Sequence, residues 1–163
     1  LVDQPGFAVG AAAERDATIR AGAAALAALY SFRSGYFALV VRRCYGVGGA
    51  ALVDCGTAHA AGVNWRAAWP SAETGSLPLD GGVVAAFKGE IAAAPDPQAA
   101  LAELTRAIDH VRSPRRTAAA FGIEEMVAPR DTRPLLCEWL EGAYRRLAHG
   151  DALGPRPGGG YVP

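Results

Sequence analysis

A short glycine-rich stretch, GVGG at positions 46–49, is the part of this sequence best suited to chemistry. A run of apolar β-forming residues, 36–41, precedes it, and an apolar, alanine-rich run follows it that predicts a helix over 48–55. The first amides of a helix have no partner inside the helix and lie at the positive end of its dipole. Glycines let a ligand approach the backbone closely. The stretch therefore predicts a site that binds phosphate or stabilises an oxyanion.

Phosphate binding is the weaker of these two interpretations. The stretch lacks the lysine and the Ser/Thr of a P-loop, and it does not match G-x-G-x-x-G. Two possibilities then stay open. The glycines could serve only the close packing of a strand against a helix. Alternatively, two amides among Val47, Gly48 and Gly49 converge on one oxygen and form an oxyanion hole.

The remaining side chains offer little conventional catalytic machinery. No G-x-S-x-G motif and no other recognisable nucleophile accompanies a histidine. His110 and His149 fall near predicted helix C-termini, where a dipole role is expected. His59 and Cys55 lie just after the glycine stretch and could line its site. There is no carboxylate pair and no metal-ligand spacing, so no metal site is predicted.

Two further groups lie close to interesting positions. Arg42 and Arg43 close the predicted strand beside the glycine stretch, where one of them could orient an anionic substrate. Trp69-Pro70 predicts a turn with a packed indole, and either Asp131 or Thr132 is expected to cap the last helix.

Composition bounds the class of protein. The chain has 163 residues, half of them apolar, which suffices for one domain with a real core. Its 16 basic and 16 acidic residues cancel, which argues against a broad nucleic-acid surface. No apolar window is long enough for a membrane span. Three cysteines without metal-ligand spacing indicate free thiols in a reducing cytoplasm. The strand-like start at Leu1 suggests the interior of a longer protein.

Hydrophobic periodicity predicts strands that alternate with helices, which indicates an α/β domain with mostly parallel strands. The expected strands are 1–3, 36–41, 62–69, 72–77 and 123–127. The expected helices are 11–32, 48–55, 80–91, 97–111, 113 to about 122, and 132–149, with Asp96 and Ser113 as N-caps. We expect a domain over 1–150 and a Pro/Gly-rich tail over 151–163. The small number of strands suggests a layer that packs on another half or subunit.

Six motifs in order carry a resemblance that spans residues 1 to about 147. They are LVDQPGF, ERDATIRAGAAAL, FALVVRRCYGVGGAALV, WPSAE, GGVVAAFKGEI and AAAFGIEEMVAPRDTRPLL. Together they resemble the C-terminal half of the carboxyltransferase component of biotin-dependent acyl-CoA carboxylases, such as the acetyl- and propionyl-CoA enzymes. The resemblance implies a crotonase-like (ClpP/crotonase) layered fold.

The resemblance also implies a reaction. Carboxybiotin on a carrier protein would deliver its carboxyl group to the α-carbon of an acyl-CoA, and this chain would be the biotin-facing half. The oxyanion hole would be formed by Val47 and Gly48, or by Gly48 and Gly49, with Tyr45, Gly46 and Ala50 beside the cofactor. The implied partners are a biotin carboxylase, a biotin carrier protein and an N-terminal carboxyltransferase half, in an oligomer.

Departures from the family pattern keep two alternatives open. The family's RKxYGGAYD reads RRCYGVGGAA here, and Ala50 replaces an acidic residue implicated in acyl-chain selection. The family's AEIAVMG reads AETGSLPLD, which introduces Gly75, Ser76 and Pro78. The chain could instead belong to a biotin-dependent acyl-CoA decarboxylase, or be a non-catalytic half that completes an oligomer.

Overall fold

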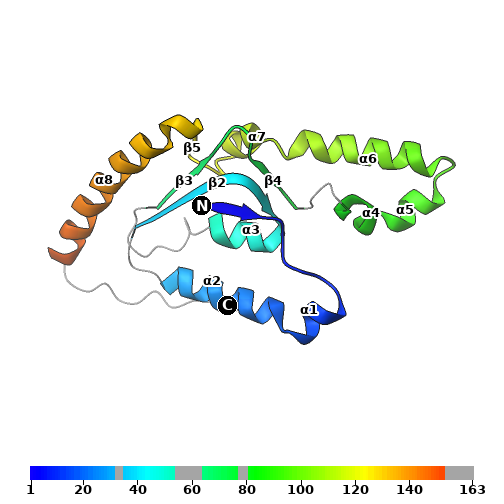
Figure 1. Cartoon of the computed structure of the whole chain (residues 1–163), viewed down its shortest axis with the longest axis horizontal. Coiled ribbons are helices and arrows are strands. Elements are labelled where there is room, and N and C mark those ends of the chain that lie inside the picture. Colours follow the sequence, from blue (N-terminus) through cyan, green and yellow to red (C-terminus); the bar gives the residue numbers. More distant parts are fainter. Residues whose placement is uncertain (32–34, 54–63, 77–80, 153–163) are drawn as a thin grey trace.

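The computed structural model describes residues 1–31, 35–53, 64–76 and 81–152. The strands in these ranges form one sheet whose neighbouring strands all run parallel (Figure 1). They are β1 (Val2–Gln4), β2 (Tyr36–Tyr45), β3 (Asn64–Ala68), β4 (Glu73–Gly75) and β5 (Glu125–Met126). This confirms the predicted α/β class with parallel strands.

The long strand β2 organises the sheet. On one side it pairs first with β3, with Tyr36 opposite Asn64, and then with β4, with Arg43 opposite Glu73. On its other side it pairs with β1. The prediction that this strand ends at position 41 is wrong. It continues through two arginines because Asp3 of β1 binds both guanidinium groups and so keeps their charges paired beside the ladder.

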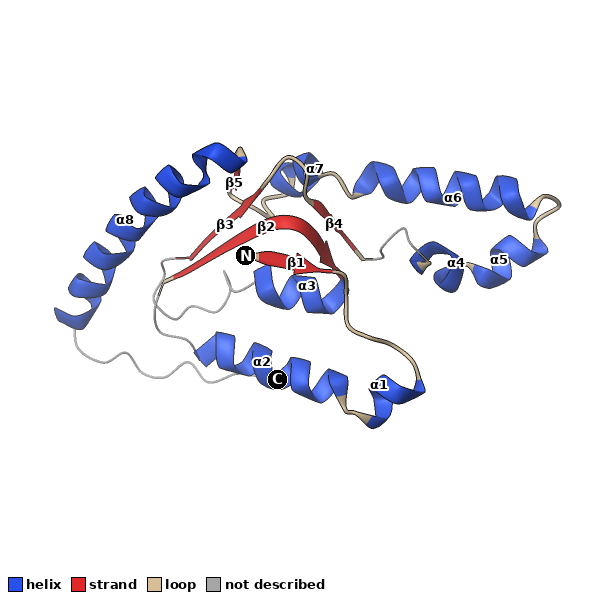
Figure 2. Ribbon diagram, in the orientation of Figure 1, coloured by secondary structure: helices blue, strands red, loops and turns tan. Residues whose placement is uncertain are grey.

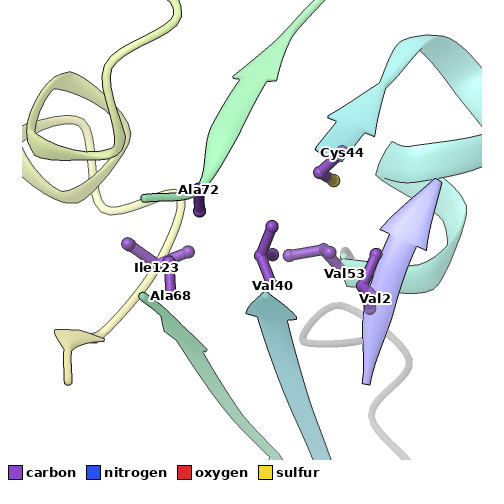
Figure 3. Packing of buried hydrophobic residues seen from close by; sticks show 7 residues of the cluster. All are labelled: Val2, Val40, Cys44, Val53, Ala68, Ala72 and Ile123. Atoms are coloured by element: carbon purple, nitrogen blue, oxygen red, sulfur yellow. The ribbon is translucent and has the colours of Figure 1, made fainter. Parts of the chain in front are cut away.

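Side chains alternate between the two faces of the sheet, as the pleat requires. On one face Val40 packs with buried residues from β1, β3, the helix α3 (Gly46–Val53) and the segment before β5. Figure 3 shows this cluster, which consists of Val2, Val40, Cys44, Val53, Ala68, Ala72 and Ile123. On the other face Leu39 packs with Ala67 and Val127, and the start of α8 (Thr132–Ala152) covers them through Leu135.

The N-terminal helical segment is divided. We predicted one helix over 11–32, but α1 (Ala11–Arg15) ends before α2 (Thr18–Ser31) begins. Ala17 between them has φ 55, in the left-handed region, which breaks the i→i−4 ladder. Apolar spacing alone does not reveal such a break, since both pieces keep the same period. α2 then lies beyond α3 on one side of the sheet (Figure 1).

Three helices form an arm that extends from the sheet (Figure 2). They are α4 (Gly82–Ala86), α5 (Lys88–Ala93) and α6 (Pro97–Val111). The predicted helix 80–91 is divided at Phe87, whose ψ of 22 departs from helical geometry. The helix 97–111 is confirmed, as is its cap, because Asp96 Oδ1 accepts hydrogen bonds from the amides of Gln98 and Ala99.

The chain returns to the sheet through α7 (Pro114–Ala119), capped by Ser113 as predicted. This helix ends earlier than expected, because Phe121 turns into the left-handed region at φ 55 and the Gly122 amide bonds back to the Thr117 carbonyl. β5 is correspondingly shorter than the predicted 123–127. A 3-10 turn, η2 (Pro129–Asp131), leads into α8, which runs three residues past the predicted end.

Candidate active site

Three parallel strands end together at one edge of the sheet. β1 ends at Gln4, whose partner on β2 is Cys44, and the next residue of β2, Tyr45, lies opposite Gly75 at the end of β4. Ligands of open α/β sheets bind outside the carboxyl ends of the strands. The predicted glycine stretch begins at this edge, directly after Tyr45.

The glycine stretch is the first turn of a helix and not a loop. We predicted the helix to begin at Gly48, but α3 begins at Gly46, immediately after the last residue of β2. Gly46 has φ 61, and this left-handed conformation redirects the chain from strand to helix within one residue. Glycine adopts it at little cost because it has no Cβ. Gly46 is therefore a conformational requirement of the junction.

The next glycines are needed for space. A Cβ on Gly49 would lie 2.7 Å from the carbonyl carbon and 2.9 Å from Sγ of Cys44. A Cβ on Gly48 would lie 3.1 Å from two ring carbons of Phe7. Both residues are buried, whereas Val47 is 70% exposed and Ala50 is also exposed. Close packing thus accounts for Gly48 and Gly49 as residue types.

The first turn of α3 carries the candidate amides. In a helix that begins at Gly46, the amides of Gly46, Val47 and Gly48 have no acceptor within the helix. Gly49 follows in the same turn, packed directly against the backbone of Cys44. Unpartnered amides at the positive end of the helix dipole can donate to an anion. Unpartnered amides of the first turn of α3, those of Val47 and Gly48 among them, thus lie at the carboxyl edge of the sheet.

The Tyr45 side chain anchors the end of β2. Its ring is 1% exposed, and its hydroxyl donates to Glu73 Oε2 at 2.8 Å. Arg112 Nη1 donates to the same Glu73 oxygen at 2.8 Å, and Arg112 Nε donates to Asp109 Oδ1 at 2.6 Å. Burial and the Glu73 carboxylate raise the pKa of Tyr45, so the phenol stays neutral at pH 7. Of our three cofactor-binding candidates, Tyr45 thus has its side chain engaged within the protein.

The network around Tyr45 includes residues that the sequence did not single out as a site. Glu73 belongs to the WPSAE motif, which was the available signal, but nothing in the sequence pointed to Arg112. Arg112 follows the end of α6, and its carbonyl accepts a hydrogen bond from the Thr74 amide of β4. This pairing joins the helical arm to the strand ends beside α3.

The two arginines that precede the glycine stretch form ion pairs with the neighbouring strand β1. Arg42 Nη2 lies 2.7 Å from Asp3 Oδ2, and Arg43 Nε lies 2.8 Å from Asp3 Oδ1. Hydrogen bonds from Arg43 and Arg42 hold the pKa of the Asp3 carboxyl well below its usual range. Both guanidinium groups therefore bind β1, and the substrate-orienting role that we expected for one of them has no support in this geometry.

The other sequence candidates lie away from this edge or outside the described residues. His110 and His149 occupy the last turns of α6 and α8, as expected. Cys55 and His59 are not among the described residues. Trp69 forms the predicted packed turn, with Nε1 donating to Thr132 Oγ1 at 2.9 Å, and that hydroxyl also donates to a backbone carbonyl.

Neither a metal centre nor a membrane-spanning helix is found in the described residues. No group of three or more His, Cys, Asp or Glu side chains lies close enough together within those ranges to hold a metal ion. Among the helices described, none combines the length and the apolarity that crossing a bilayer requires.

In the described residues, a parallel α/β sheet ends at an edge where a helix begins with unpartnered backbone amides. Residues 1–149 match the family model of the carboxyl transferase domain. The chain belongs to the carboxyl transferase domain family.

Named relatives agree with this assignment. The chain is 34% identical over 142 residues to the methylmalonyl-CoA carboxyltransferase 12S subunit of Propionibacterium freudenreichii subsp. shermanii, covering 86% of this chain and 26% of the relative. It is 34% identical over 134 residues to the propionyl-CoA carboxylase carboxyltransferase subunit of Haloferax mediterranei, covering 82% of this chain and 25% of the relative. The chain thus spans about a quarter of the length of these relatives.

Solved structures establish the fold. The transcarboxylase 12S structure has a TM-score of 0.75 and 30% identity, covering 99% of this chain and 29% of that one. The beta subunit of P. aeruginosa geranyl-CoA carboxylase has a TM-score of 0.78 at 22% identity, covering 98% of this chain and 29% of that one, and it supports the fold alone. The expected crotonase-like fold is confirmed.

Proposed function

We propose that this chain is the biotin-facing half of an acyl-CoA carboxyltransferase, which moves a carboxyl group from carboxybiotin to the α-carbon of an acyl-CoA. Membership of the carboxyl transferase family supports the reaction. The observation that carries the assignment to this half is the first turn of α3, which lies at the carboxyl edge of three strands and begins with unpartnered amides. Both the acyl-CoA and the biotin are proposals for this chain.

The donor set suits the chemistry that biotin supplies when bound, which is a carboxyl group and then a negatively charged ureido oxygen. Backbone amides stabilise such an oxygen without changing protonation, and the helix dipole adds to their effect. Tyr45 is a neutral phenol that is already hydrogen-bonded to Glu73. It therefore holds the end of β2 and takes no part in proton transfer to the substrate. No step needs a titrating side chain of this chain.

We assign the oxyanion hole to Val47 and Gly48 in preference to Gly48 and Gly49. The reason is that Gly49 is buried against Cys44, where a Cβ would lie 2.7 Å from the carbonyl carbon, whereas Val47 is 70% exposed in the first turn of α3. Gly49 then has a packing role against Cys44. Gly46 and Ala50 border the same turn, so they remain our candidates for backbone or surface contact with biotin.

Replacing Val47 by proline tests the hole directly. The side chain is 70% exposed and lies in the first helical turn, where proline is tolerated, so the variant removes one amide with little steric cost. We expect kcat for carboxyl transfer to fall about 10²- to 10³-fold, as for other single oxyanion-hole donors. Size-exclusion chromatography should show an unchanged assembly.

The matched control is Val47→Ala, which keeps the amide and removes the exposed side chain. We expect it to retain activity within a few-fold. Wild-type rates in an intact Val47→Pro assembly would contradict the assignment, and equal losses in both variants would assign the effect to the side chain.

The proposed enzyme needs further parts. The chain spans 26% of the 12S relative, and we propose that an N-terminal half supplies the thioester-side hole, with a biotin carrier protein and a biotin carboxylase as partners. The transcarboxylase 12S relative forms a hexamer, which supports an oligomer here. We place the enzyme in the cytoplasm, and the free thiols of Cys44 and Cys137 support that location.

A further inference from the structure

The ring of Phe7 lies between two helices, against a glycine on each. A Cβ on Gly22 of α2 would lie 2.5 and 2.7 Å from carbons of the Phe7 ring. A Cβ on Gly48 of α3 would lie 3.1 Å from two carbons of the same ring. Phe7 itself follows β1 and is half-buried. The ring thus fills the contact between α2 and the first turn of α3.

Both glycines need an explanation, because glycine is a poor helix former. Neither Gly22 nor Gly48 has a left-handed φ, so backbone conformation does not require glycine at either position. The three nearest atoms to the Cβ position of Gly22 all belong to Phe7, and those near Gly48 are Phe7 and the Gln4 amide carbon, at 3.4 Å. Room for the Phe7 ring is therefore what both positions share.

The loop that carries Phe7 is held at its start. The Gln4 side-chain oxygen accepts a hydrogen bond from the Gly6 amide at 3.0 Å, which fixes the turn between β1 and Phe7. On its opposite side, α3 is blocked by the contact between Gly49 and Cys44 of β2. The first turn of α3 is consequently held between the sheet and the Phe7 ring.

We propose that Phe7 is a positioning residue that sets the direction of the Val47 and Gly48 amides. This inference rests on the proposed oxyanion hole. It adds to that hole a supporting side chain that is distant in the sequence. Phe7 contacts the helix that carries the donors and contributes no donor itself. A misplacement of about 1 Å at such a site lowers rates about 10²-fold, so small changes in the ring should be visible in kcat.

The test is a cycle of Phe7→Leu, Gly48→Ala and the double variant in the assembled enzyme. Each single variant should lower kcat for carboxyl transfer about 10- to 100-fold, with KM for acyl-CoA within about twofold of wild type. The double variant should recover at least about fivefold over the worse single variant, because the added methyl occupies space that the smaller side chain leaves. Phe121→Leu, at an 85% exposed phenylalanine, is the matched control and should keep wild-type kcat.

Hydrogen exchange at residues 46–53 gives a readout that does not depend on activity. Phe7→Leu should speed exchange at the start of α3 at least about fivefold, and the double variant should slow it again. If Phe7→Leu does not assemble, Phe7→Met, which keeps most of the volume, takes its place in the same cycle.

The outcomes separate the two proposals. Unchanged kcat and exchange in the Phe7 variants of an active enzyme would overturn the positioning role alone. A KM effect equal to the kcat effect, or strictly additive losses in the cycle, would also overturn it. If exchange responds as expected but the wild-type assembly transfers no carboxyl group, the proposed function fails while the packing relation stands.

Discussion

Two turns of this chain use the left-handed region in opposite ways. At the end of β2, Gly46 has φ 61 and leads straight into a helix whose next glycines pack without room for a side chain. After α7, Phe121 has φ 55, yet it carries a bulky ring that is 85% exposed. An L-residue in this conformation costs about 1–2 kcal/mol, which only glycine avoids.

The difference indicates which turn is under geometric constraint. The turn at Phe121 ends a helix, with the Gly122 amide bonded to the Thr117 carbonyl and Arg66 Nη2 donating to the Phe121 carbonyl, and it tolerates a strained residue. The turn at Gly46 must also place helical amides at the carboxyl edge of the sheet. A strained residue is thus present at the turn that ends α7, and strain is absent at the turn that forms the candidate site.

The largest expected stability effect is that of Gly49→Ala. The new Cβ would lie 2.7 Å from backbone of Cys44, which cannot rotate away, so we expect a loss of about 3 kcal/mol or more. Urea unfolding measures it. The control is Gly142→Ala in α8, where nothing lies within 4 Å, and a gain of about 0.5–1 kcal/mol is expected there. An unchanged free energy of unfolding in Gly49→Ala would mean that α3 is not packed tightly on β2.

Gly46→Ala should have an intermediate effect. Space is available, since the nearest atom is the Ser76 carbonyl oxygen at 3.7 Å, so the cost is that of φ 61 alone, about 1–2 kcal/mol. The same unfolding measurement applies, with Gly89→Ala, in open space on α5, as the control that should not destabilise. A loss much above this range would indicate a steric contact that Gly46 does not have in the structure.

Phe121→Gly should stabilise the chain. Relieving the strained φ should raise the free energy of unfolding by about 1–2 kcal/mol. The greater freedom of glycine in the unfolded chain should lower it by about 0.5–1 kcal/mol, so the net increase should be about 0.5–1 kcal/mol. Phe121→Ala keeps the strain and should be neutral within about 0.5 kcal/mol. If both Phe121→Gly and Phe121→Ala are less stable than wild type, the exposed ring makes a stabilising contact.

The smallest effect concerns Asp3, which joins β1 to the strand that leads into the Gly46 turn. Because Arg43 and Arg42 lower its pKa, its contribution to stability is full above the unfolded-state pKa of about 4. It is lost as the pH falls from there through the lower folded-state pKa. Asp3→Asn should therefore be slightly less stable than wild type at pH 7. This difference in stability should diminish below pH 4.

Urea midpoints of both proteins at pH 7, 4 and 3 measure the Asp3 effect. Repeating the pH 7 series in 1 M salt is the control, since exposed ion pairs are screened there and the gap should narrow. A difference in urea midpoint that grows on acidification would contradict the sign of the Asp3 pKa shift.

Local signals in the sequence predicted much of the fold. The apolar run beginning at Tyr36, the Asp96 cap and the Ser113-Pro114 start each depend on neighbours within a few positions, and the structure confirms them. The breaks at Ala17 and Phe87 were missed, because alanine and phenylalanine carry no signal for a left-handed or irregular backbone. The extension of β2 through Arg42 was missed because Asp3, its partner, is 39 residues away.

The sequence by itself narrowed the class of site: glycines between a strand and a helix, with no phosphate-binding side chains and no recognisable nucleophile, indicate either close packing or backbone donors for an anion, and the six ordered motifs favour the donors. Only the tertiary structure decided what each glycine does. Gly46 provides the left-handed turn, Gly49 accommodates Cys44, and Gly48 accommodates the Phe7 ring. The physical reason is that these contacts join residues from β2, α3 and the loop after β1, and spacing along the chain does not encode the distance between them.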